Sequence, residues 1–139
     1  MPIPPAVLQN FPLLRELPTE TLIRLGGIMT ERTFARREIM VRKGEPGNVL
    51  GFLVEGRLQG VDFTVDGREV GLYFVEPNDY FGELSVIDGL PRPEFVIAVG
   101  RSRVATLARE EARSLLVSTP AIAQRVTERL AQRLRAVSA

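Results

Sequence analysis

Short runs of alternating hydrophobic and polar residues fill the middle of the chain. They occupy residues 38–42, 49–54, 57–64, 68–75, 95–99 and 103–108. Turn signals separate them, and Asp66-Gly67 between two alternating runs is typical of a β-hairpin. Short strands at intervals of about 8 to 12 residues indicate a sandwich or barrel. We therefore predict an antiparallel β-roll of the jelly-roll type, with about eight strands over about residues 30–108.

The residues before this region predict helices. Residues 13–29 carry helical periodicity in two pieces divided at Pro18, and Thr19 is the expected N-cap of the second piece. Residues 2–5 are rich in proline and predict an extended lead. The helical pattern is expected to stop at Gly26-Gly27.

The last part of the chain returns to helical spacing. Residues 110–118 predict a short helix, and Thr119-Pro120 is typical of the start of a longer one that reaches about residue 138. Residues at alternating spacings of four and three predict a homodimer seam on that helix: Ala123, Thr127, Leu130, Leu134 and Val137. Alternatively, the helix only packs on the roll, through Ile122 and Val126. The expected fold class is mainly β with flanking helices (α+β), as a single domain over residues 1–139.

Residues 80–92 combine groups that suit an anion. Gly82 has no Cβ, so the backbone can approach a bound group closely. The amides of Gly82, Glu83 and Leu84 point at such a group if a helical turn starts there, and Arg92 adds a permanently charged planar fork. Glu83, an acceptor only when ionised, suits sugar hydroxyls. In the alternative interpretation, Gly82 is a plain turn glycine and Glu83 forms a surface ion pair with Arg92.

The wider pattern favours the first interpretation. Residues 80–92 resemble the phosphate-binding cassette of the cyclic nucleotide-binding domain family. Residues 11–17 resemble the opening helix of that family, residues 43–48 its Gly-Glu-x-Gly-Asp turn, and residues 51–58 the strand that follows. The similarity runs from about residue 10 to the end and is greatest to the sensor domains of Crp/Fnr-type bacterial regulators.

The resemblance implies a set of ligand contacts. Cyclic AMP or cyclic GMP is the expected ligand, with no other cofactor, no metal and no catalytic residue. Arg92 and the amides at 82–84 are expected on the phosphate, Glu83 on the ribose 2′-hydroxyl, and Ser138 near the base, beside Val137. The remaining ligand-binding candidates are Ser85 and Pro93, with Leu72, Phe81, Leu84 and Val86 as the apolar wall.

The two residues that follow the cassette depart from the family pattern. Family members carry Ser or Ala after the cassette arginine, whereas this chain has Pro93 and Glu94. Proline has no N–H to donate to phosphate. Glu94 adds a negative charge that competes for Arg92 if the two share a strand face.

Composition narrows the functional classes. The chain has no cysteine and no histidine, which excludes disulfides, zinc fingers, iron–sulfur clusters and His-ligated haem. The net charge of +1 does not indicate a polyanion-binding protein, and we interpret Arg125, Arg129, Arg133 and Arg135 as solvated helix-face residues. No helix-turn-helix, signal peptide or membrane span is apparent, so the segment is expected to be cytoplasmic, without DNA or membrane binding of its own.

Several functions remain open. The first is a regulatory sensor of a cyclic nucleotide, either the sensor domain of a Crp/Fnr-like transcriptional regulator or a stand-alone relative. The second is a degenerate site that acts by protein contacts, in which Arg92 pairs internally with Glu83 or Glu94. The third is a site for another anion, such as a cyclic dinucleotide or an organic acid. No phosphate loop, nucleophile elbow or metal motif supports an enzyme.

Overall fold

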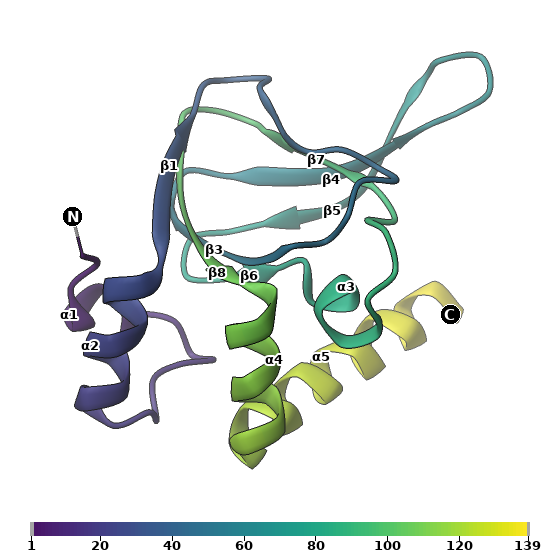
Figure 1. Cartoon of the computed structure of the whole chain (residues 1–139). Helices are drawn as coiled ribbons and strands as arrows, with labels where there is room; N and C mark the ends of the chain where they lie inside the picture. Colours follow the sequence, from purple (N-terminus) through teal and green to yellow (C-terminus); the bar gives the residue numbers. More distant parts are fainter. Residues whose placement is uncertain (1, 139) are drawn as a thin grey trace.

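Two four-stranded antiparallel sheets form a β-roll (Figure 1). The computed structural model describes residues 2–138, the last of them by its backbone only. The first sheet has the order β1 (Thr30–Phe34), β8 (Ser102–Ala108), β3 (Val49–Glu55) and β6 (Tyr80–Phe81). The second has the order β2 (Ile39–Val41), β7 (Phe95–Ala98), β4 (Leu58–Phe63) and β5 (Glu69–Val75). This architecture confirms the predicted fold class, including the eight strands.

The hairpin between β4 and β5 forms at the predicted turn. The amide of Thr64 donates to the carbonyl of Arg68 at 2.9 Å, and the amide of Gly67 donates to the carbonyl of Thr64 at 2.9 Å. Gly67 has a φ of +83°, a left-handed conformation that glycine adopts readily. Two strands were not anticipated as such. β1 lies ahead of the first alternating run at residues 38–42, and β6 has only two residues, too few to show alternation.

Helices cover one side of the roll. They are α1 (Pro5–Leu8), α2 (Thr19–Ile28), α3 (Glu83–Asp88), α4 (Arg109–Ser118) and α5 (Pro120–Ser138). The starts of α4 and α5 agree with the sequence-based expectation, and Pro120 is the first residue of α5. Figure 1 shows α5 running beneath α3, so the cassette segment lies over the last helix.

Four details of the N-terminal segment were predicted wrongly. Residues 13–17, expected to be the first helical piece, form turns between α1 and α2. The proline-rich lead is not wholly extended, because Pro5 occupies the first turn of α1, where its missing N–H is unneeded. Thr19 is the first residue of α2, and Pro18 takes the cap position. The helix also continues through Gly26, whose carbonyl accepts from the Ile3 amide at 3.0 Å; a Cβ on Gly26 would lie 2.0 Å from the Ile3 carbonyl oxygen.

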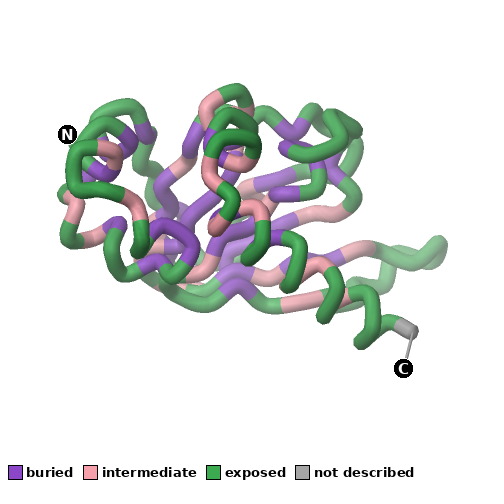
Figure 2. Tube along the Cα trace, turned by 90° about the horizontal axis from the view of Figure 1, so that it is seen from below, coloured by how far each residue is buried: buried purple, intermediate pink, exposed green. Residues whose placement is uncertain are grey.

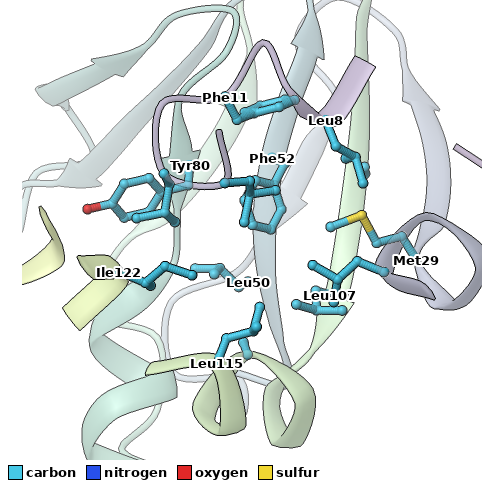
Figure 3. Packing of buried hydrophobic residues seen from close by; sticks show 14 of the residues in the cluster. Leu8, Phe11, Met29, Leu50, Phe52, Tyr80, Leu107, Leu115 and Ile122 are labelled. Carbon is cyan, nitrogen blue, oxygen red and sulfur yellow. The ribbon is translucent and has the colours of Figure 1, made fainter. Parts of the chain in front are cut away.

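The core consists of two hydrophobic clusters. One lies inside the roll and takes residues from both sheets, including Phe81. The other joins the helices to the first sheet around Phe52, Leu107 and Leu115 (Figure 3). Ile122 and Val126 of α5 are buried in this second cluster, so the start of α5 packs on the domain as the alternative interpretation expected.

Candidate functional site

A pocket of about 380 Å³ lies where α3, strand β5, the segment before β7 and the end of α5 meet. Its lining holds these predicted site residues: Leu72, Gly82, Glu83, Leu84, Ser85, Arg92 and Pro93. Phe81 is not among the lining residues, because its ring is buried inside the roll, and Val86 is likewise in the core. The side chain of Ser138 lies outside the described residues. The lining also contains Tyr73, Glu94, Arg133, Ala136 and Val137.

Two glycines allow the cassette to pack closely. Gly82 precedes α3 with a φ of +87°, and a Cβ there would lie 2.2 Å from Nη1 of Arg92. Gly47, in the turn before β3, would place a Cβ 2.0 Å from Cβ of Ser85. A side chain at either position would displace the groups that line the pocket.

Arg92 is a buried cation held by backbone groups. Its side chain donates from Nη2 to the carbonyl of Val49 at 2.8 Å, and its own amide donates to the carbonyl of Glu45 at 2.8 Å. Only 6% of the residue is exposed. Burial lowers the pKa of the guanidinium, and the negative charge of Glu94 opposes this shift most strongly, ahead of Tyr73 and Glu83.

Arg92 forms no ion pair with a carboxylate within 4.0 Å among the side chains that the structure describes. The internal pairs expected for a degenerate site are therefore not present. Glu83 pairs with arginines of α5, and Glu94 accepts from the hydroxyl of Tyr73. The buried Arg92 guanidinium, which lines the pocket, therefore has N–H donors that no carboxylate occupies.

Glu83 is fixed by the last helix. Its Oε1 lies 3.0 Å from Nη1 of Arg133 and 3.1 Å from Nη2 of Arg129. Arg129 also bonds Asp79 at 3.0 Å, and its guanidinium lies 3.4 Å from the centroid of the Tyr80 ring. Because the side chain of Glu83 is only 4% exposed, these arginines neutralise an otherwise buried charge.

Arg129 and Arg133 correct the sequence-based interpretation of the basic helix. The side chain of Arg129 is only 17% exposed, and that of Arg133 is 37% exposed and lines the pocket. Arg125 does lie at the surface, paired with Glu16. A signal was present in the sequence, since positions 129 and 133 continue the face that Ile122 and Val126 begin.

Tyr73 and Glu94 form a hydrogen bond at the pocket wall. The hydroxyl of Tyr73 donates to Oε1 of Glu94 at 2.7 Å. Burial and the neighbouring Glu94 charge raise the pKa of the Tyr73 hydroxyl, so it stays protonated and remains a donor. The guanidinium of Arg133 lies 5.1 Å from the centre of the Tyr73 ring.

The described part of the chain contains neither a metal-binding cluster nor a membrane-spanning helix. Residues 2–137 contain no cluster of three or more acidic side chains arranged to hold a metal ion. None of the helices in the described segment has the length and apolar character needed to span a membrane.

The fold and pocket define a β-roll domain with a cation-containing pocket next to its last helix. Residues 31–119 match the family model described as the cyclic nucleotide-binding domain. The chain therefore belongs to the cyclic nucleotide-binding domain family.

One relative and two solved structures illustrate the similarity. The chain is 33% identical over 102 residues to the CRP-like cAMP-activated global transcriptional regulator of Mycobacterium tuberculosis, covering 73% of this chain and 46% of the regulator. It thus spans about half the length of that relative. The N-terminal domain of a transcriptional regulator from Streptomyces coelicolor is 31% identical, with a TM-score of 0.70 and 95% and 92% of the two chains covered. The Thermus thermophilus catabolite activator protein gives 25% identity and a TM-score of 0.78, over 91% of this chain and 60% of that one.

Proposed function

We propose that this domain is a regulatory sensor whose pocket binds a cyclic nucleotide, with cyclic AMP as the first candidate. The observation that carries the proposal is Arg92, a buried cation of the pocket wall without a carboxylate partner within 4.0 Å among the described residues. A buried charge without a counter-ion favours binding of an anion. The name of the Mycobacterium tuberculosis relative, which calls that regulator cAMP-activated, supports the choice of ligand.

Each part of the ligand has a matching part of the pocket. Arg92 and the amides at 82–84 would hold the cyclic phosphate by charge-assisted hydrogen bonds. Glu83 would accept from the ribose 2′-hydroxyl, since Oε2 has no donor among the described side chains and Glu83 lines the pocket. Leu72, Leu84 and Val137 supply apolar surface for the base. They offer few polar groups to distinguish adenine from guanine.

The last helix would transmit the signal. Glu83 contacts both the pocket and two arginines of α5, so a ligand that bonds Glu83 changes the free energy of the helix arrangement. The output would be a changed contact with another domain or with a second copy of the chain. Leu130 is partly buried against the core, whereas Thr127 and Val137 of the predicted homodimer seam are exposed and able to meet a partner.

A second candidate function keeps the anion site and changes the ligand. Pro93 offers no amide to a phosphate, and Glu94 places a negative charge in the pocket wall. These two residues favour an anion with a hydrogen-bond donor of its own, such as a cyclic dinucleotide. In both cases we propose a regulatory module of the cytoplasm and no catalytic activity.

Isothermal titration with cyclic AMP and cyclic GMP tests the proposal. We expect micromolar binding that Arg92→Leu weakens by at least about tenfold, because at least one charge-assisted hydrogen bond is lost. Arg125→Leu is the matched control, since Arg125 lies at the surface and its only ion pair within the described residues is with Glu16. Absence of heat at millimolar cyclic nucleotide, or equal affinity of Arg92→Leu and the unaltered protein, would overturn the assignment. Binding of a cyclic dinucleotide alone would select the second candidate.

A further inference from the structure

The side chain of Tyr73 extends across the neighbouring strand β4 and reaches Glu94, just after the cassette. In the second sheet β5 pairs with β4, and β4 pairs with β7. Tyr73 stands opposite Gly60 of β4, and Gly60 stands opposite Val96 of β7. A Cβ on Gly60 would lie 2.3 Å from Cζ of Tyr73. The ring therefore lies over Gly60, and its hydroxyl reaches Glu94, next to the first residue of β7.

Glu94 has two possible partners around the pocket. It is two positions from Arg92, and both side chains line the pocket. The Glu94 charge acts on the Arg92 guanidinium more strongly than that of any other group that affects its pKa. Yet no guanidinium nitrogen of Arg92 lies within 4.0 Å of a carboxylate oxygen of Glu94. The Glu94 carboxylate instead accepts a hydrogen bond from the Tyr73 hydroxyl at 2.7 Å.

We propose that Tyr73 is a positioning residue that holds Glu94 away from Arg92 and so keeps the pocket cation available to an anionic ligand. The proposal rests on the proposed function, since it names the residue that keeps the anion site open. Tyr73 provides a donor for a carboxylate that otherwise has Arg92 as a nearby cation. Without the hydroxyl, Glu94 would turn to Arg92 and compete with the ligand as an internal anion.

The arrangement also explains how Glu94 is tolerated at this position. A carboxylate beside a buried guanidinium normally forms an ion pair with it. Here the strand register, the missing Cβ of Gly60 and the protonated tyrosine together give that carboxylate another partner. The predicted competition between Glu94 and a phosphate for Arg92 is thereby suppressed in the folded domain.

Four variants test the proposal by titration with cyclic AMP. Tyr73→Phe should weaken binding about tenfold, because Glu94 is released toward Arg92. Glu94→Gln should bind at least as tightly as the unaltered protein. The double variant Tyr73→Phe/Glu94→Gln should regain the affinity of Glu94→Gln, because no released charge remains. Tyr80→Phe is the control, since the Tyr80 hydroxyl is buried without a hydrogen-bond partner among the described residues and is not part of the pocket lining.

The outcomes separate this proposal from the proposed function. If the unaltered protein binds and the double variant stays as weak as Tyr73→Phe, the tyrosine acts by another route and only this proposal is overturned. If the unaltered protein binds neither cyclic AMP nor cyclic GMP, the proposed function is overturned. Ligand-free crystal structures then decide the present proposal, because Tyr73→Phe should bring the Glu94 carboxylate into ion-pair distance of Arg92. A Glu94 that keeps its place in that variant would overturn it.

Discussion

The two halves of α5 are held by different forces. The first half is buried in the helical core through Ile122 and Val126, each 4% exposed. The second half has Val137 at 85% exposure and is attached to the domain through Arg129 and Arg133 on Glu83. Figure 2 shows the change along the helix, from buried and intermediate residues to exposed ones near the C-terminus.

This contrast separates the stability of α5 from its response to a ligand. Apolar packing at the first half does not depend on the contents of the pocket. Part of the attachment of the second half runs through a carboxylate that itself lines the pocket. A ligand can therefore alter the end of the helix without unfolding its beginning.

The largest loss of stability is expected from a substitution in the first half of α5. Ile122→Ala should lower the free energy of unfolding by about 3 kcal/mol, because it leaves a cavity in the helical core. Urea titration followed by circular dichroism measures this change. Ile23→Ala is the matched control, since Ile23 of α2 is 58% exposed and its truncation removes little buried surface. Equal losses in both variants would contradict the packing described for α5.

A smaller and more local loss of stability is expected when the attachment of the second half of α5 is weakened. Glu83→Gln should lower the free energy of unfolding by about 2 kcal/mol, because it weakens an ion pair with Arg129 and a charge-assisted hydrogen bond from Arg133. Amide hydrogen exchange should accelerate beyond Arg129 and stay unchanged around Ile122. Uniform acceleration along the whole helix would show that its two halves are not held independently.

A substitution at Tyr80, whose ring contacts Arg129 of α5, should have the opposite effect on stability. Its hydroxyl is buried without a partner among the described residues, and in Figure 3 it points away from the hydrophobic cluster. Tyr80→Phe should therefore raise stability by about 1 kcal/mol.

The Tyr80→Phe variant should also change how stability depends on pH in the alkaline range. Burial raises the pKa of Tyr80 from 10.0 to about 12, so the folded state keeps a proton that the unfolded state loses, and stability falls as pH rises through this window. Unfolding free energies measured across that range should fall less steeply in Tyr80→Phe. An identical slope in both proteins would show that the Tyr80 hydroxyl is not desolvated.

The smallest effect is expected at the surface of α5. Arg125→Ala removes an ion pair with Glu16 in which both side chains are largely exposed, at 44% and 65%. The unfolding free energy should change by no more than about 0.5 kcal/mol. A loss as large as that of Glu83→Gln would remove the distinction between the two kinds of arginine on this helix.

The sequence predicted those features that depend on neighbouring residues. Alternation and turn residues located six of the strands, and Thr119-Pro120 located the start of α5. The cassette resemblance selected Gly82, Glu83 and Arg92, which the fold brings to one pocket. These residues could be recognised because the motif that contains them is a single short segment of the chain.

Features that depend on distant pairs were missed. Arg129 and Arg133 contact Glu83 about 50 residues away in the chain, and nothing near them in the sequence identifies that partner. Phe81 was assigned to the pocket wall, although pairing of the short β6 with β3 directs it into the roll. Tyr73 received no role, because its contact with Glu94 depends on the register between strands.

The ring of Tyr73 lies in space that only a glycine at position 60 leaves open. Because of this dependence, glycine at position 60 has to precede tyrosine at position 73 in evolution. A large residue at 60 has to be replaced by glycine before tyrosine can be accepted at 73, and after that step glycine can no longer be replaced without loss. We expect lineages with a side chain at position 60 to lack the tyrosine, so that the history of this site can be traced from two residues of neighbouring strands.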